Sequence, residues 1–307
     1  MKRLDKIINR VKKFSIRKRI LPPNVLLTNF CNQNCSYCFA KDEMEKSAVK
    51  EMSLEDFKKL VVILKKNKIR TLRLMGGEPT LHSYFDEIIK LALAEFEEIL
   101  IFTNGLIPTK SRRILEKNLN KISFNFNLST PAFEENPAKR KEIITLIKKY
   151  SQNKQTNIGF TLTDLKKDYG KLAQGLKPEI LKKIGIRFGL AKAIMGEKPF
   201  FNKEDNKKLS KKIVDLVKFF KKLGIKEIFL DCGLEKKMFN VSQRNYLLKN
   251  THLKGWGCEG KWGSFDITPD LLLFTCFPFY KKKVPIKKIK NFCDFQKFFP
   301  KQNCFKE

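Results

Sequence analysis

The stretch Cys31-Asn32-Gln33-Asn34-Cys35-Ser36-Tyr37-Cys38 places three cysteines within eight residues. Their spacing, Cys-x3-Cys-x2-Cys, brings three thiols onto one short loop. Cysteine thiolates are the usual protein ligands of iron–sulfur clusters, and complete protein ligation of a [4Fe–4S] cubane takes four of them. Three cysteines on one loop therefore predict a cubane in which one iron stays open to a substrate or a cofactor.

Two other interpretations of these cysteines fit the sequence less well. A structural zinc site takes four ligands in paired Cys-x2-Cys spacings, often with histidine. The chain has two histidines, His82 and His252, and no second Cys-x2-Cys pair. Three cysteines on an eight-residue loop also make a poor disulfide framework.

The composition indicates a globular protein of one medium domain with an appendage, or of two small domains. The chain has 307 residues, of which 42% are hydrophobic, enough for a sizeable core. Its longest apolar stretches, near 271–280, are shorter than the roughly 20 residues that a bilayer-spanning helix needs. The N-terminal segment is basic and lacks the apolar core of a secretory signal. We therefore expect no transmembrane segment and a cytoplasmic location, where cysteines stay reduced.

The charge is strongly positive. Lys and Arg number 64 against 32 Asp and Glu, which gives a formal net charge of +32. Such a field attracts nucleic acid, anionic lipid or an acidic peptide. The lysines are spread over every segment, however, so compositional drift explains the charge equally well, and both interpretations stay open.

Residues 1–22 are predicted to form a basic amphipathic helix that ends at Pro22-Pro23. Apolar side chains recur at helical spacing on one face, at Leu4, Ile7, Ile8, Val11 and Phe14. A basic amphipathic helix packs on the domain that follows it, or it binds a membrane surface or a partner.

Strand-like and helix-like segments alternate from residue 23 to residue 231. The expected strands are 25–28, 71–75, 99–103, 122–128, 157–162, 186–190 and 227–230, and the expected helices are 53–66, 85–97, 111–119, 137–150, 177–184 and 203–223. This alternation predicts an α/β fold with a parallel sheet of six or seven strands and right-handed crossovers. In a parallel barrel the chemistry lies at the carboxyl ends of the strands, where the cysteine loop falls.

Two more motifs follow strand ends, Gly76-Gly77-Glu78-Pro79 and Thr103-Asn104-Gly105. Together with the cysteine loop, in this order, they resemble the radical S-adenosylmethionine (radical SAM) superfamily over roughly residues 23–231. The resemblance implies a partial (β/α)6 TIM-like barrel. It also implies that Cys31, Cys35 and Cys38 hold a [4Fe–4S] cluster whose fourth iron binds S-adenosylmethionine.

In the resembling enzymes, an electron from the cluster cleaves S-adenosylmethionine and releases a 5′-deoxyadenosyl radical, which takes a hydrogen atom from the substrate. A reducing partner such as flavodoxin or ferredoxin supplies that electron. The sequence assigns no catalytic side chain beyond the residues that bind cofactors. The cofactor supplies the chemistry, and the protein supplies its position.

The resemblance also implies a cofactor pocket. Its expected residues are Gly76, Gly77, Glu78, Pro79, Thr103, Asn104, Asn125, Asn127 and Arg187. The glycines allow close approach, the Glu78 carboxylate would meet the methionine ammonium, and Arg187 would meet its carboxylate. Asn125 and Asn127 point to one side of a strand, where the ribose hydroxyls would satisfy them. The alternatives are plain turns, edge solvation and, for Arg187, a surface salt bridge.

The C-terminal region, residues 232–307, carries the other five cysteines, Cys232, Cys258, Cys276, Cys293 and Cys304. It is similar to a shortened SPASM or Twitch-type extension, with Leu271 where that pattern has glycine. The resemblance implies that four of these cysteines hold a second iron–sulfur cluster. The alternative is that they are idle or core thiols.

The resemblance favours modification of a peptide or protein side chain. One alternative keeps the radical chemistry and changes the substrate to RNA or a small cofactor precursor; the net charge makes nucleic acid a possible partner. Another is a non-catalytic iron–sulfur scaffold that binds peptides.

Overall fold

The computed structural model describes residues 22–152, 156–173, 175–193, 198–231, 233–253, 265–276, 281–288 and 297–298. The helix predicted within residues 1–22 and four of the candidate cysteines, Cys232, Cys258, Cys293 and Cys304, lie outside the described residues. Among the described helices, none combines the length and the apolar character that crossing a bilayer requires.

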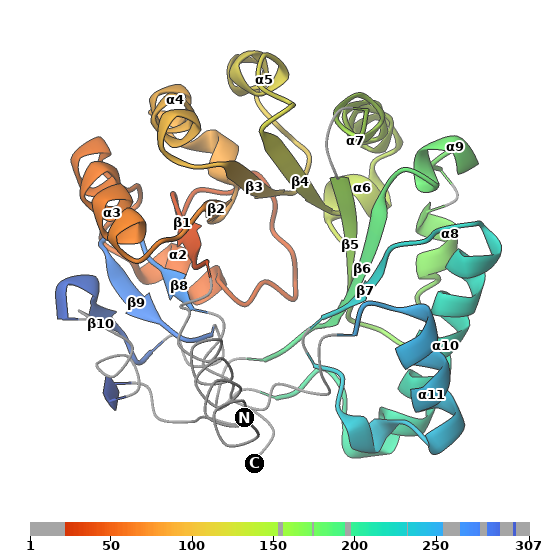
Figure 1. Cartoon of the computed structure of the whole chain (residues 1–307). Helices are drawn as coiled ribbons and strands as arrows, with labels where there is room; N and C mark the ends of the chain where they lie inside the picture. The colour runs from red at the N-terminus through yellow and green to blue at the C-terminus, as the bar shows by residue number, and fades with distance from the viewer. Residues whose placement is uncertain are drawn as a thin grey trace, which may run out of the picture.

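Seven parallel strands form the barrel, as the alternation predicted. They are β1 (Asn24–Leu26), β2 (Thr71–Met75), β3 (Glu98–Thr103), β4 (Ile122–Asn127), β5 (Thr156–Leu162), β6 (Gly185–Leu190) and β7 (Ile228–Leu230). Each pairs with the next in parallel register. Figure 1 shows the sheet curved into an open ring with helices around its outside. The predicted partial TIM-like barrel is therefore confirmed, and its sheet is not closed.

Three further strands continue the same sheet beyond β1. They are β8 (Asp266–Ile267), β9 (Leu272–Phe274) and β10 (Val284–Pro285). β8 pairs with β1 in parallel, while β9 and β10 extend it as antiparallel strands. The described part of the C-terminal region is thus built onto the first strand of the barrel.

The longer helices cover the outer face of the sheet. They are α3 (Leu54–Lys66), α4 (Phe85–Glu95), α5 (Thr109–Glu116), α7 (Pro137–Tyr150) and α10 (Asn206–Lys222). α3 begins where the sequence predicted, because the Ser53 side chain accepts a hydrogen bond from the Asp56 backbone. The predicted helix 203–223 opens instead with a 3₁₀ turn, Lys203–Asp205, before α10. The predicted helix 177–184 is the shorter α9 (Pro178–Leu181).

Four helices were not expected from the sequence: α2 (Lys41–Lys46), α6 (Pro131–Glu135), α8 (Tyr169–Ala173) and α11 (Val241–Asn250). α2, α6 and α8 are short, and α2 has no apolar stripe to give it a helical period. α6 and α8 follow the carboxyl ends of β4 and β5, so they stand at the mouth of the barrel. This is the end at which the chemistry of a parallel barrel is placed.

The barrel core lies between the sheet and the helices. Along β2, β3 and β5, buried residues alternate with partly exposed ones. The buried set packs on the helices; for example, Phe160 and Phe188 stack at 5.9 Å, and Phe220 of α10 lies 5.5 Å from Phe188. The alternate positions face the barrel interior and include Arg73 of β2 and Phe102 of β3. The strand register places Asn125 of β4 and Arg187 of β6 on the same side of the sheet. The interior face is therefore polar, as a ligand-binding barrel requires.

Candidate functional site

The three-cysteine loop begins directly after β1, at the mouth of the barrel. Cys31, Cys35 and Cys38 are all half-buried, and the Cys38 backbone nitrogen donates to the Cys35 carbonyl at 3.1 Å. Burial raises the pKa of each thiol, and it raises the pKa of Cys35 to about 12, with Cys38 and Cys31 adding to the effect. The thiols of the bare protein are therefore neutral, and they must lose their protons when metal binds.

The donor set of this loop suits an iron–sulfur cubane. Within the described part of the chain, no three His, Cys, Asp or Glu side chains converge to hold one metal ion. A cubane does not need such convergence, because each thiolate binds a different iron. Three soft sulfur ligands on one loop therefore fit a [4Fe–4S] cluster.

Gly76 and Gly77 lie directly against the cysteine loop. The Gly77 nitrogen donates to the Thr28 carbonyl at 2.8 Å, and the Glu78 nitrogen donates to the Phe30 carbonyl at 2.8 Å. A Cβ atom would lie 2.4 Å from Thr28 O at Gly76 and 2.3 Å from Phe30 O at Gly77. Glycine is thus required here so that the end of β2 can touch the backbone that leads into the cysteines.

Glu78 is fully buried and ties the end of β2 to the end of β3. Its carboxylate accepts hydrogen bonds from the Thr80 hydroxyl at 2.6 Å, the Thr103 hydroxyl at 3.0 Å and the Asn104 nitrogen at 2.8 Å. Burial raises the pKa of Glu78, and these donors oppose the rise. The side chain braces the turn; its contact with a methionine ammonium stays a prediction, as does any cofactor contact of Pro79, which is buried at the start of the 3₁₀ turn Pro79–Leu81.

Asn104 connects the β3 end to the cysteine loop. Its Nδ2 atom donates to Asn32 Oδ1 at 2.8 Å and lies 3.8 Å from Cys31 Sγ. Its Oδ1 atom accepts from the Leu106 nitrogen at 2.8 Å, and Asn32 Nδ2 donates to the Leu106 carbonyl at 2.9 Å. Two of the sequence motifs are therefore joined by side-chain amides beside the first cysteine.

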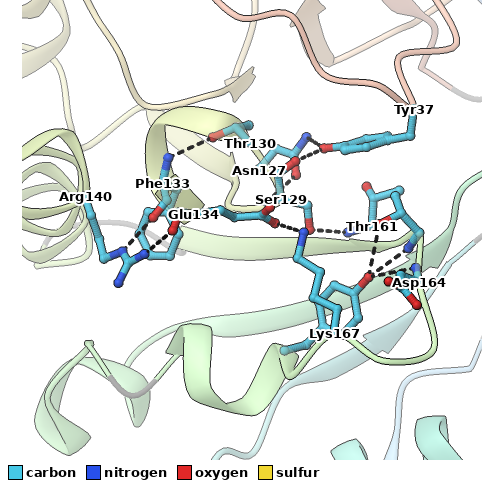
Figure 2. A network of polar contacts seen from close by, with 12 residues as sticks. Tyr37, Asn127, Ser129, Thr130, Phe133, Glu134, Arg140, Thr161, Asp164 and Lys167 are labelled. Atoms are coloured by element: carbon cyan, nitrogen blue, oxygen red, sulfur yellow. Dashed lines mark hydrogen bonds and ion pairs between the residues drawn. The ribbon is translucent and has the colours of Figure 1, made fainter. Parts of the chain in front are cut away.

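Tyr37 anchors the other end of the loop to β4, as Figure 2 shows. Its hydroxyl accepts from Asn127 Nδ2 at 2.9 Å and donates to the Ser129 carbonyl. Asn127 Oδ1 accepts from the Ser129 nitrogen at 3.2 Å, and Ser129 Oγ accepts from the Thr161 nitrogen at 3.0 Å. Burial raises the pKa of Tyr37, so the hydroxyl stays neutral. No sequence signal pointed to Ser129, because its contact with Tyr37 uses a backbone carbonyl.

Asn125 lies on the same side of β4 as Asn127, as predicted, and it is buried. A Cβ atom at Gly159, on the neighbouring strand, would lie 3.4 Å from Asn125 Oδ1. The glycine thus leaves room beside this amide. Contact of Asn125 and Asn127 with a ribose stays a prediction.

Arg187 of β6 takes part in a group of contacts that the sequence did not predict. Its guanidinium is 2.6 Å from the Asp231 carboxylate and 5.5 Å from the centre of the Phe102 ring. Arg73 lies against the same ring at 5.2 Å. The salt-bridge alternative for Arg187 is therefore present, and its contact with a methionine carboxylate stays a prediction.

The C-terminal strands touch the cysteine loop. Phe274 of β9 packs with Leu26 and Ala40 in a small apolar cluster that also contacts Cys38. Leu271 has φ 57°, the left-handed conformation that glycine favours, at the position where the similar pattern has glycine. Cys276, the one described cysteine of the C-terminal region, is half-buried two residues after Phe274.

Comparison with known proteins agrees with this geometry. Residues 25–169 match the model of the Radical SAM superfamily. A probable GTP 3′,8-cyclase of Methanocella arvoryzae is 29% identical over 111 residues, 36% of this chain and 35% of the relative. The antilisterial bacteriocin subtilosin biosynthesis protein AlbA of Bacillus subtilis is 30% identical over 105 residues, 34% of this chain and 23% of AlbA. The matched segment thus spans about a third or less of these relatives.

Two solved structures share the fold. Streptococcus suis SuiB bound to S-adenosylmethionine has a TM-score of 0.62 at 17% identity, over 89% of this chain and 64% of SuiB. Native anSMEcpe with bound AdoMet has a TM-score of 0.60 at 18% identity, over 92% of this chain and 82% of that chain.

An open parallel barrel with a three-cysteine loop after its first strand defines a class of iron–sulfur proteins. Residues 25–169 form a radical SAM domain, so this part of the chain belongs to the radical SAM superfamily. The relatives that this domain matches include a probable enzyme, the GTP 3′,8-cyclase.

Proposed function

We propose that this protein reductively cleaves S-adenosylmethionine and abstracts a hydrogen atom from a peptide or protein side chain. The observation that carries the proposal is the contact between the Gly76-Gly77 turn and the backbone that leads into Cys31, Cys35 and Cys38. Cys31, Cys35 and Cys38 would hold the cluster, which would supply the electron that cleaves the sulfonium of S-adenosylmethionine.

The residues of this chain hold and orient the reactants. The cysteine loop is braced by Asn104 at one end and by Tyr37 at the other, which restricts its position relative to the strand ends. Gly76 and Gly77 offer backbone at the rim of the same site. Asn125 and Asn127 lie on the interior side of β4, where a ribose would lie, and Asn127 is also bonded to Tyr37 and Ser129.

A peptide substrate is supported by two relatives. AlbA is named for biosynthesis of a bacteriocin, and SuiB has been solved with the precursor peptide SuiA, with a TM-score of 0.61 to this chain at 15% identity. The second candidate is a small nucleotide-like precursor, favoured by the match to the GTP 3′,8-cyclase. A flavodoxin or ferredoxin would serve as reductant, and a cytoplasmic location would keep the cysteines reduced.

The proposed division of the chain is a basic helix in 1–22, a barrel in 23–231 and an auxiliary region in 232–307. Support for an auxiliary cluster comes from the left-handed Leu271 and from the packing of Phe274 on the cysteine loop. If Cys276 is a ligand of that cluster, Cys276→Ala will lower the iron content by about four atoms per chain. Unchanged iron content would remove Cys276 from the ligand set.

The main test is made under anaerobic conditions. The protein is reconstituted with iron and sulfide, reduced and mixed with S-adenosylmethionine, and 5′-deoxyadenosine is measured by mass spectrometry. We expect product from the native chain and none from Cys35→Ala. A loaded, reduced native protein that binds S-adenosylmethionine and forms no product, even with a peptide substrate, would favour the scaffold alternative.

A further inference from the structure

A groove of about 510 Å³ runs along the outside of the barrel between α8 and α10, which lie side by side in Figure 1. We call it the α8–α10 groove. Its apolar floor consists of Leu165, Leu216 and Phe219. A Cβ atom at Gly170 would lie 3.3 Å from the Phe219 ring, so glycine keeps the α8 side of the groove open.

The rim of the groove is basic. Four lysines line it, Lys171, Lys208, Lys211 and Lys212, against two aspartates, Asp168 and Asp215. Asp168 already has a partner, because its Oδ1 atom accepts a hydrogen bond from the Lys171 backbone nitrogen at 3.0 Å. Lys212 is also held, since its Nζ atom donates to the Leu165 carbonyl at 2.8 Å.

The other three lysines are available. Lys171, Lys208 and Lys211 are exposed, and none of them forms an ion pair with a residue that the structure describes. Three ammonium groups above an apolar floor complement a segment that carries both carboxylates and apolar side chains. RNA would instead favour exposed aromatic faces for stacking, whereas Phe219 is partly buried and packs edge-on against Phe220.

The groove adjoins a loop that starts at the mouth of the barrel. Leu165 and Asp168 belong to the loop that leaves the carboxyl end of β5, and α10 starts on the same side of the sheet. In Figure 2, Lys167 of this loop pairs with Glu134 of α6, close to Ser129. A chain that lay in the groove would therefore reach the mouth over this loop.

We propose that the α8–α10 groove binds an acidic, apolar-anchored segment of the peptide substrate, apart from the residue that reacts. The inference rests on the proposed function and adds the substrate class that the site selects. The groove holds the segment by charge and by burial of its apolar anchors, and the reacting residue extends into the mouth.

The test uses the full-length, cluster-loaded protein and a fluorescein-labelled peptide of Glu and Leu residues at helical spacing, followed by fluorescence anisotropy. A peptide with Lys in place of each Glu is the charge control. We expect the acidic peptide to bind, the basic one not to bind, and the Kd to rise with salt.

Charge reversal locates the binding. The triple variant Lys171→Glu, Lys208→Glu, Lys211→Glu should weaken binding of the acidic peptide by at least about ten-fold. The matched control reverses Lys58, Lys66 and Lys90, three exposed lysines on α3 and α4 across the barrel, and should bind within about two-fold of the native protein. Replacement of the groove lysines by Gln provides a milder variant should charge reversal disturb folding.

If both triple variants weaken binding of the acidic peptide equally, the effect comes from the overall charge and the assignment is overturned. If neither variant weakens it, the peptide does not bind at the groove and the assignment is also overturned. Binding of a single-stranded RNA of similar length without binding of the peptide would overturn it in favour of nucleic acid. Formation of 5′-deoxyadenosine without added peptide is measured in parallel. Cleavage of S-adenosylmethionine without peptide binding would contradict only the assignment of the groove. Peptide binding at the groove without any cleavage of S-adenosylmethionine would contradict only the proposed function.

Discussion

Asn104 Nδ2 lies 3.8 Å from Cys31 Sγ and holds the cysteine loop through Asn32. A hydrogen-bond donor near a cluster sulfur stabilises the reduced cluster and raises its potential. Asn104→Ala should therefore lower the midpoint potential, by about 20–60 mV for one hydrogen bond. A redox titration followed by electron paramagnetic resonance measures the change.

The control for this prediction is Asn118→Ala, which removes an amide that bonds to the Ile114 carbonyl on α5, away from the loop. Its potential should match that of the native protein. A potential unchanged in Asn104→Ala would show that the amide positions the loop without acting on the cluster.

Gly77→Ala should prevent cluster loading. The added methyl group would lie 2.3 Å from the Phe30 carbonyl oxygen, so the cysteine loop must move away from the β2 end. Overpacking of this kind costs roughly 1–3 kcal/mol or more. Iron content after reconstitution is the measurement. At Gly175 the methyl would meet only the flexible tip of Ile144 at 3.1 Å, so Gly175→Ala should load normally.

Tyr37→Phe should lower the free energy of unfolding by about 1–3 kcal/mol, because Asn127 and the Ser129 carbonyl both lose a partner in the interior. The cysteines are untouched, so the iron content should stay near that of the native protein. Urea denaturation of both proteins checks the prediction, with Tyr84→Phe as the control, since Tyr84 is 52% exposed. Equal midpoints for Tyr37→Phe and the native protein would contradict it.

Asp266 predicts a pH dependence of stability. Burial raises the pKa of this carboxyl from 3.8 to about 7, although Asn24 and Arg73 oppose the rise. Between these values the folded protein holds a proton that the unfolded chain releases, so the free energy of unfolding falls as the pH rises, until about pH 7. From pH 5 to pH 8 this group should contribute a fall of roughly 2–3 kcal/mol.

The asparagine variant isolates this contribution. Asp266→Asn cannot ionise, so its unfolding free energy should lack that part of the decline when urea curves are compared at the two pH values. If the unfolding free energies of the native protein and the variant change with pH in parallel, Asp266 is ionised in the folded state and the prediction is wrong.

Local patterns were enough to predict much of the barrel. β2 and α7 have the bounds expected from the sequence, because an apolar run is followed by Gly76 in one case and preceded by Asn136 and Pro137 in the other. The short helices were missed where the apolar period is absent, as in α2. Pairing of β8 with β1 was also missed, because a two-residue strand carries no signal for a distant partner.

The sequence predicted the candidate cluster ligands of the site but not the residues that hold them in place. The cysteine spacing identified the loop, and the glycine motif identified the turn beside it. The roles of Glu78 and Tyr37 depend on which groups the fold brings near, such as the Ser129 carbonyl, and every residue has such a carbonyl. Arg187 was chosen for its charge, but its contacts with Asp231 and Phe102 arise only when β3, β6 and the end of β7 share one interior.

The parallel pairing of β1 with β8 also affects how the protein is made. Asn24 pairs with Asp266, a separation of 242 residues. On the ribosome, β1 can pair with β2 early, but its other edge stays open until most of the chain has emerged. Contacts of such long range form slowly, and an unpaired edge is exposed to aggregation in the meantime. Phe274, which packs against the cysteine loop, lies in β9, directly after β8, so the loop also reaches its final surroundings late.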